Sequence, residues 1–203
     1  MKLYYFPGAC PLVTHIVLEW IGKPYDTQRL TREETKEPAY LALNPEGLVP
    51  TLVDGDFVLT QSAAILEYLA ELNPQAELLG DDPVSRAETR RWLSFCNSDM
   101  HRTFGLIFGA SKFSDGNEAA AQTLSAKATD MLRSFFAIAN DRLRGRDWLT
   151  GQRSVADPYL YVLLRWAHAK EVPVDDFAEL TRFYARMERD PGVQAALRAQ
   201  GLA

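Results

Sequence analysis

The sequence predicts an α/β domain followed by an all-helical domain. Short strands and helices alternate over the first 79 residues, and helical periodicity without a convincing strand follows from Pro83 onward. The charge balance also changes there, because residues 1–79 carry a net charge of −6 and the remainder of the chain carries +1. Domain-size statistics favour two small domains for a chain of 203 residues. We therefore expect domains at 1–79 and 86–203, with a linker at 80–85.

The beginning of the chain has the pattern of a βαβ unit. Residues 2–6 form a short aromatic-rich strand, and residues 25–30 form a second one. Between them, apolar side chains from Val13 to Trp20 recur at helical spacing, and Gly22 ends the helix. This order predicts a parallel pair of strands with a right-handed crossover.

The rest of the first domain is predicted to be a hairpin and a helix. Residues 31–43 are irregular or weakly helical, and residues 44–47 form a turn. Segments 51–53 and 57–59 flank an Asp-Gly-Asp turn, which is typical of a tight β-hairpin. Residues 63–72 then have the periodicity of a helix.

The second domain is predicted to consist of helices only. Five segments carry helical periodicity: residues 84–110, 117–144, 154–170, 175–189 and 191–199. Ser154 and Asp157 precede one of them in an S-x-x-D arrangement, which is a capping box with Asp in place of Glu. We interpret this box as a folding device without a catalytic role.

The composition is that of an ordinary soluble globular protein, with 47% apolar and 24% charged residues. A net charge of −5 argues against a nucleic-acid binder, since phosphate binding requires a basic surface. No apolar run approaches the ~20 residues that span a bilayer, and the start of the chain lacks the features of a signal peptide. We expect a cytoplasmic protein whose two cysteines, Cys10 and Cys96, are reduced.

Cys10 is the first candidate for chemistry. It follows the first strand and directly precedes Pro11, which suits the first helical position, so Cys10 would cap that helix. The free N–H groups and the dipole of the helix would stabilise a thiolate there. The alternative is a small buried cysteine, which is our interpretation of Cys96. The motif is not C-x-x-C, which disfavours a dithiol redox enzyme.

Two further segments of the first domain could bind a peptide-like ligand. Pro50 stands at the entrance of a strand, and Val49 before it would present its N–H and C=O to a cleft. Gln61 and Ser62 open a helix, whose free N–H groups bind carboxylates well. An ordinary X-Pro turn and simple helix capping by Ser62 explain the two segments equally well when each is considered alone.

Considered together, these segments resemble the N-terminal domain of a glutathione transferase. The second half adds Ser98-Asp99-Met100-His101-Arg102 and the segment Gly151–Asp157. The whole set is similar to the bacterial beta class, and the resemblance covers nearly the entire chain. It implies a thioredoxin-like N-terminal domain followed by an all-α C-terminal domain, which is the cytosolic glutathione transferase fold.

The resemblance also implies roles for the first domain in binding glutathione as a co-substrate. Val49, before Pro50, would hold the cysteinyl backbone of glutathione. Gln61 and Ser62 would hold its γ-glutamyl carboxylate and amine. The cysteine that matches Cys10 lies beside the glutathione sulfur in this class and can form a mixed disulfide with it.

For the second domain, the resemblance implies that His101 lies near the glutathione sulfur, with Ser98 and Arg102 contributing to binding. A lone histidine on an amphipathic helix is more often a packed or surface residue, and only the family motif favours a functional role for His101. The family typically has a lysine where this chain has Arg102. The charge is kept, but arginine differs from lysine in geometry and proton chemistry.

The function implied is conjugation of glutathione to small hydrophobic electrophiles, together with thiol–disulfide exchange at Cys10. The alternative is a non-catalytic carrier of glutathione or of hydrophobic ligands on the same fold. The electrophile would lie against aromatic side chains of the helical domain, for which the candidates are Phe104, Phe108, Phe113 and Trp166. We expect a detoxification enzyme that forms a homodimer, with no metal, nucleic-acid or membrane partner.

Overall fold

The computed structural model describes all 203 residues and divides into two compact units. One unit comprises Met1–Asp81 and Glu188–Ala203, and the other comprises Asp82–Met187. The division near residue 80 follows the change in charge balance. The expected helical domain was continuous to residue 203, whereas residues 188–203 belong to the first unit. The reason is that helix α10 (Pro191–Gln200) packs against helix α1 (Pro11–Ile21).

The first unit contains a four-stranded mixed sheet with the strand order β2-β1-β3-β4. The strands are β1 (Lys2–Tyr5), β2 (Asp26–Arg29), β3 (Thr51–Asp54) and β4 (Phe57–Thr60). Strands β1 and β2 are parallel, as the βαβ pattern predicts, while β3 is antiparallel to both β1 and β4. The predicted parallel pair and the predicted hairpin are therefore confirmed.

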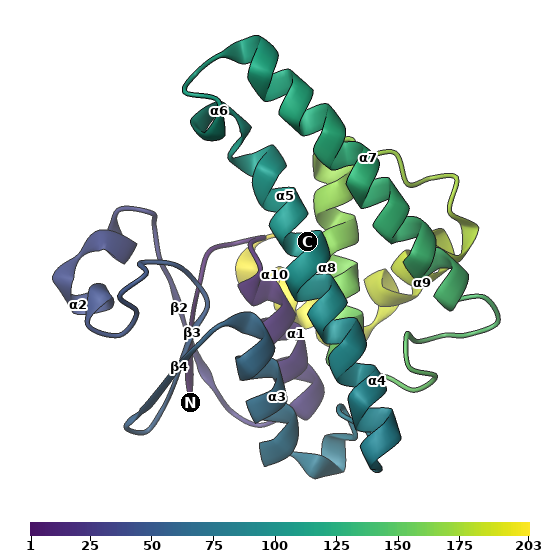
Figure 1. Ribbon diagram of the computed structural model, residues 1–203. Coiled ribbons are helices and arrows are strands. Elements are labelled where there is room, and N and C mark those ends of the chain that lie inside the picture. The colour runs from purple at the N-terminus through teal and green to yellow at the C-terminus, as the bar shows by residue number, and fades with distance from the viewer. The chain divides into compact units, whose positions relative to one another are not determined.

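The helices of the first unit lie on both sides of this sheet. Figure 1 shows α1 and α3 (Ser62–Leu72) on one side and the short helix α2 (Pro38–Leu41) on the other. Gly22 ends α1 with φ of 72°, a left-handed conformation that glycine adopts without strain. Two 3₁₀ turns, Glu34–Lys36 and Pro74–Ala76, complete the unit. The sheet shares an apolar core with α1 and α3 that includes Leu3, Leu12, Ile16, Leu52, Ile65 and Leu66.

The second unit is helical throughout, but its first predicted helix is interrupted. A π-helical turn at Phe95–Met100 separates α4 (Pro83–Ser94) from α5 (His101–Phe108). The other helices are α6 (Ala110–Phe113), α7 (Glu118–Arg142), α8 (Ala156–Ala169) and α9 (Ala178–Arg189), which reaches the boundary of the unit. No helix of the structure is both long and apolar enough to cross a membrane.

Helix α8 is the central element of the second unit. Eleven of its fourteen residues are buried, which is the pattern of a helix that is enclosed on all sides. It contacts α4 and the π-helical turn. The polar backbone groups at its start must therefore be satisfied inside the protein, since water does not reach them.

Asp157 supplies these contacts at the start of α8. Its side chain is fully buried and accepts hydrogen bonds from the Leu149 N–H at 2.9 Å, the Ser154 N–H at 2.7 Å and the Ser154 hydroxyl at 2.9 Å. The aspartate half of the predicted box is confirmed, since Asp157 reaches back to the N–H of Ser154, whereas the Ser154 hydroxyl accepts from the N–H of Ala156 at 3.3 Å and not from that of Asp157. Burial raises the pKa of Asp157 to about 6, although the three donors oppose the shift.

The substitution Asp157→Ala should lower the free energy of unfolding by about 2–4 kcal/mol, because three buried donors would lose their acceptor. Urea unfolding followed by circular dichroism at pH 7 measures this change. The matched control is Asp82→Ala in the exposed capping box of α4, where Asp82 accepts from the N–H groups of Val84 and Ser85. That control should cost clearly less, because water can replace the lost acceptor at an exposed helix start, and equal losses in the two variants would contradict the role of Asp157.

The same carboxyl predicts a pH dependence. Between pH 3.8 and about 6, the folded chain retains the Asp157 proton while the unfolded chain has released it. The stabilisation from this proton is therefore present at low pH and is lost as the pH rises through that interval. The free energy of unfolding of the parent should fall over this range relative to that of Asp157→Ala.

Candidate active site

Three segments of the first unit meet at one edge of its sheet. Strands β1 and β3 are antiparallel, with Tyr4 opposite Thr51, so the end of β1 lies beside the start of β3. Strand β4 is antiparallel to β3, with Thr60 opposite Thr51, so its end reaches the same edge. The turn before α1, the segment before β3 and the start of α3 therefore lie together, and these carry the candidates of the first domain.

Cys10 occupies the position before the first residue of α1, as predicted from Pro11. Its side chain does not cap the helix. Instead, the Cys10 thiol donates to the carbonyl oxygen of Val49, with 3.5 Å between Sγ and O. The hydroxyl of Ser62 also forms a hydrogen bond with the sulfur. One sulfur atom thus connects all three segments.

The surroundings of Cys10 do not favour the thiolate that we expected there. Burial raises the pKa of the thiol from 9.0 to about 11, and the hydrogen bond from Ser62 offsets only part of this shift. The removal of water therefore outweighs the stabilisation that the helix start provides. At neutral pH, Cys10 is a protonated thiol and a hydrogen-bond donor.

The segment before β3 is held in place by side chains of the preceding loop. The Val49–Pro50 peptide bond is cis, and Pro50 is buried. Tyr40 and Asn44 both donate to the carbonyl of Leu48, at 2.6 Å and 2.7 Å. Val49 itself is half-buried, and no group of the chain accepts from its N–H. This N–H is consequently free to pair with an extended ligand backbone.

The start of α3 has free donors as well. Gln61 precedes the helix with φ of 70°, and its side chain does not cap the first turn but donates to Glu46 at 3.0 Å. The N–H groups of Ser62, Ala63 and Ala64 have no acceptor within the chain. A positive φ at a residue other than glycine is found mainly at functional positions. Uncapped N–H groups at a helix start favour an anionic ligand.

The remaining candidates lie in the second unit, around the π-helical turn. Ser98 is within the turn, His101 is the first residue of α5, and Arg102 follows it. Ser98 and Arg102 are exposed, and His101 is half-buried. The helical periodicity of residues 84–110 did not predict this π-helical turn. Such a turn changes the spacing of side chains along the helix and often occurs at functional sites.

His101 belongs to a chain of hydrogen bonds that reaches α8. The hydroxyl of Tyr159 donates to Asn97 Oδ1 at 2.8 Å, and the same hydroxyl lies 2.8 Å from Nδ1 of His101. Because Tyr159 has a single hydroxyl proton, it must accept from His101, so the imidazole proton is on Nδ1. This leaves Nε2 as a hydrogen-bond acceptor. Burial lowers the pKa of His101 to about 4, and the ring is neutral at pH 7.

Sequence reasoning missed Tyr159 and Asn97, which are separated by 62 residues in the chain. The only signal was that Tyr159 follows the capping box by two residues, which places it on the central helix.

The four aromatic candidates of the helical domain have different surroundings. Phe104 is fully buried and Trp166 is nearly so, and both rings contact His101 or its neighbours in the core. Phe108 is 49% exposed and Phe113 is 62% exposed. Only the last two therefore present free apolar surface to a ligand.

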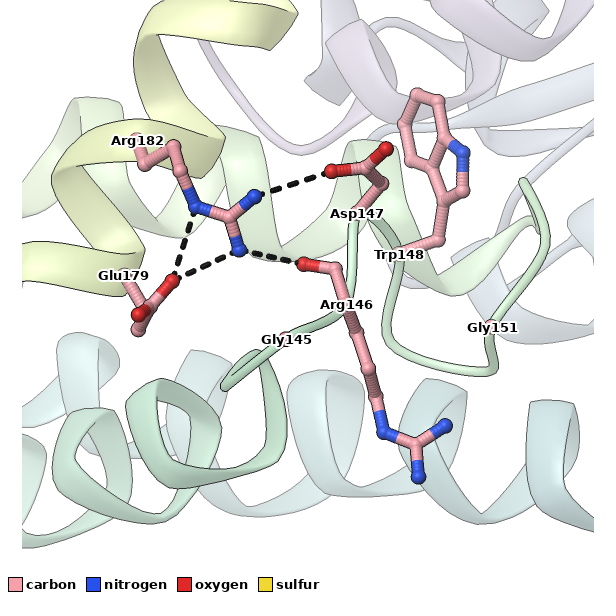
Figure 2. Close-up of a pocket in the computed structure, with 7 residues that line it drawn as sticks. All are labelled: Gly145, Arg146, Asp147, Trp148, Gly151, Glu179 and Arg182. Atoms are coloured by element: carbon pink, nitrogen blue, oxygen red, sulfur yellow. Dashed lines mark hydrogen bonds and ion pairs between the residues drawn. The ribbon is translucent and has the colours of Figure 1, made fainter.

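The second unit has a pocket that contains none of the predicted site residues. It has a volume of about 640 Å³ and is lined by Gly145, Arg146, Asp147, Trp148, Gly151, Glu179 and Arg182. Figure 2 shows the Arg182 guanidinium donating to Glu179, to Asp147 and to the carbonyl of Arg146. These hydrogen bonds link α9 to the 143–151 loop, so the role of Arg182 is structural. No group of three or more His, Cys, Asp or Glu side chains is placed to hold a metal ion.

Comparison with known proteins identifies the family. Residues 9–72 match the family model for the N-terminal domain of glutathione S-transferases, and residues 92–191 match that for the C-terminal domain. Glutathione S-transferase GST-4.5 of Xanthomonas campestris pv. campestris is 44% identical over 204 residues, with both chains covered completely.

Solved structures agree with these matches. The glutathione S-transferase of Xylella fastidiosa is 45% identical with a TM-score of 0.95, and 100% of this chain and 99% of that chain are covered. A beta-class enzyme of Sphingomonas chungbukensis is 31% identical with a TM-score of 0.87, and a sphingomonad enzyme complexed with glutathione is 32% identical with a TM-score of 0.88. In both comparisons, 100% of this chain and 100% of the other chain are covered. The chain has the thioredoxin-like and helical domains of these enzymes, and it belongs to the glutathione S-transferase family.

Proposed function

We propose that this chain conjugates glutathione, as a co-substrate, to small hydrophobic electrophiles. The observation that carries the proposal is the sheet edge at which the free N–H of Val49, the thiol of Cys10 and the uncapped start of α3 lie together. A peptide backbone, a thiol and a carboxylate are the three groups that glutathione brings, and this edge has a partner for each.

Val49 and Pro50 would fix the centre of glutathione. The N–H of Val49 is unpaired, and its carbonyl accepts only the Cys10 thiol within the chain. A cysteinyl residue could pair with both groups as an added strand does. Because two donors already hold the Leu48 carbonyl, little ordering of this segment would be required on binding.

Gln61 and Ser62 would bind the γ-glutamyl end. The free N–H groups at the start of α3 and the Ser62 hydroxyl suit its carboxylate. The amine of the same group would approach the side chains of Gln61 and Glu46, which are hydrogen-bonded to each other. Glu46 then adds a negative charge opposite the ammonium.

Cys10 and His101 would act on the glutathione thiol. Conjugation requires a thiolate, which can be stabilised by directed donors. The Cys10 thiol is such a donor, because it is protonated and already donates to a carbonyl. We assign to His101 the complementary role of proton acceptor, through the bare Nε2 atom. Ser98 and Arg102 are assigned to glutathione binding on the family motif, with Arg102 supplying the positive charge.

The exposed rings of Phe108 and Phe113 are the proposed contact surface for the electrophile. Phe104 and Trp166 support Phe108 from the core, since the Phe104 ring stacks on the Phe108 ring and the Trp166 ring packs against it edge to face. We further propose a cytoplasmic detoxification enzyme that works as a homodimer and uses no metal. Light scattering of the purified protein in solution tests the homodimer.

A second candidate function is a non-catalytic carrier of glutathione or of a hydrophobic ligand. One observation favours it: Cys10 and His101 are both uncharged at neutral pH, so neither provides a full charge to stabilise a thiolate. Turnover of 1-chloro-2,4-dinitrobenzene with glutathione would support the enzyme. Calorimetric binding of glutathione without any turnover of a panel of electrophiles would support the carrier.

Oxidised glutathione should form one mixed disulfide with the chain, at Cys10. The Cys10 thiolate attacks one sulfur of the disulfide, a new S–S bond forms, and one glutathione thiolate leaves. The initial rate should rise about tenfold per pH unit between pH 7 and 9, because the thiolate fraction grows in that proportion below the pKa. Intact mass spectrometry measures the adduct and its loss on reduction.

The controls for this experiment are Cys10→Ala and Cys96→Ser. Cys96 is fully buried, and burial also raises the pKa of its thiol, so the Cys96 variant should behave as the parent does. An adduct that persists in Cys10→Ala, or a parent chain that forms none, would remove Cys10 from the proposed exchange reaction.

His101 should remain neutral with its proton on Nδ1 down to about pH 4. The substitution Tyr159→Phe removes the acceptor for this proton and should move the ring toward the Nε2–H tautomer. We expect kcat/KM for conjugation to fall roughly tenfold, less than the 10²–10⁴ that a proton-transfer group contributes. Nitrogen-15 spectra of the histidine rings and steady-state kinetics measure the two effects.

The matched control is Tyr161→Phe on the same helix. Tyr161 is equally buried, but its hydroxyl accepts from Arg165 rather than from His101. This variant should retain the parental tautomer and rate. The assigned network would be wrong if His101 of the parent chain took up its proton near pH 6.5, or if the tautomer of His101 were unchanged in Tyr159→Phe.

A further inference from the structure

The last helix of the chain reaches into the turn that carries Cys10. Gln200 ends α10, and its side chain is 4% exposed. Its Oε1 atom accepts from the N–H of Gly8 at 3.0 Å, and its Nε2 atom lies 3.1 Å from Nδ1 of His15 on α1. One amide therefore bridges the turn and the helix on either side of Cys10.

The direction of both hydrogen bonds is determined. Because the amide oxygen accepts from Gly8, the amide nitrogen is the atom that faces His15, and it can only donate. His15 must then accept at Nδ1, which requires the neutral ring with its proton on Nε2. The surroundings agree, since His15 is 1% exposed and burial lowers its pKa, although Glu19 opposes the shift. The rings of Tyr5 and Tyr25 lie on its other sides.

Gly8 is the residue at which this contact can control the turn. The Ala9 N–H donates to the Phe6 carbonyl at 3.3 Å, with Pro7 and Gly8 between them, and Gly8 has φ of 71°. These features correspond to a type II turn, which requires a positive φ at its third residue. The turn leads directly into Cys10. A displacement of Gly8 would therefore also move Cys10, two residues later, and with it the position of the sulfur.

We propose that Gln200 is a positioning residue for Cys10, which holds the Gly8 turn so that the thiol faces the Val49 carbonyl. The proposal rests on the function proposed for Cys10. It assigns to the C-terminal helix, 190 positions away from Cys10, a part in the chemistry of the N-terminal turn. Leu202 adds apolar support, because a Cβ atom on Gly8 would lie 3.9 Å from its side chain.

The chain contains a matched control at the other end of the same helix. There, the Trp20 indole donates to Asp190 Oδ1 at 2.8 Å, which also links α1 to α10. This contact is comparable in length and lies away from the Gly8 turn in sequence. The substitution Trp20→Phe therefore weakens the attachment of α10 without removing the contact between Gln200 and Gly8.

The test is the pH profile of Cys10 alkylation by iodoacetamide, in the Cys96→Ser chain and with intact mass as the readout. Burial is the main reason that the pKa of Cys10 stands at about 11. In Gln200→Met the released turn should admit water, and the midpoint should move toward 9.0, the ordinary value. The alkylation rate at pH 8 should then rise about tenfold, which is the change in thiolate fraction for one unit of pKa.

Gln200→Glu should retain the parental profile. Its carboxylate keeps an acceptor for Gly8 and can accept from the Nδ1–H tautomer of a neutral His15, so the turn remains anchored. Trp20→Phe should also retain the parental profile even where its melting temperature falls as much as that of Gln200→Met. Should Gln200→Met not fold, Gln200→Asn provides the same test, because its shorter amide cannot reach both partners.

A parental profile in the folded Gln200→Met or Gln200→Asn variant would overturn the proposal, as would an equal shift in Trp20→Phe. The result is independent of the proposed function, since iodoacetamide requires no glutathione site. A shifted profile in a chain that forms no glutathione adduct would keep Gln200 as the positioning residue and reject the exchange reaction of Cys10.

Discussion

The antiparallel pairing of β1 with β3 is the constraint on which the site depends. It places the end of one strand beside the start of the other, so Cys10 and Val49 meet although 39 residues separate them. The pairing of β3 with β4 adds the start of α3 at the same edge. The three segments supply a thiol, a free peptide N–H and an uncapped helix start. None of these groups alone would indicate a ligand, whereas their common location is the basis on which we propose a site for a peptide thiol with a carboxylate.

Burial determines the charge of the two groups that we propose to act on the glutathione thiol. It raises the pKa of Cys10 and lowers that of His101, so both are neutral at pH 7, each within its own compact unit. The chain therefore relies on oriented hydrogen bonds more than on formal charges. In the proposed site, a protonated Cys10 that donated to the glutathione sulfur would stabilise its thiolate without competing as a nucleophile. Conjugation is accordingly favoured by these surroundings over rapid disulfide exchange at neutral pH.

Sequence patterns were sufficient for the strands and most of the helices, because these elements depend on local spacing. Apolar periodicity located α1, α3 and α8, and the Asp-Gly-Asp turn located the hairpin. The π-helical turn at Phe95–Met100 was missed because its residues continue the helical pattern on both sides. The partners of His101 and Cys10 were missed for another reason. Hydrogen bonds such as that between Tyr159 and Asn97 join residues far apart in the chain, and no local pattern indicates which pairs will meet.

The same limitation explains the assignment of the last sixteen residues. Their sequence has the periodicity of one more helix in a helical domain, and nothing local distinguishes it from α9. Helix α10 belongs to the first unit because it packs against α1 and also makes polar contacts with β1, the Gly8 turn and α1, through Ala199, Gln200 and Asp190. Each of these partners lies within the first 25 residues of the chain. The first unit is therefore built from both ends of the chain, and the turn that carries Cys10 accepts one of its supports from a residue 192 positions later in the sequence.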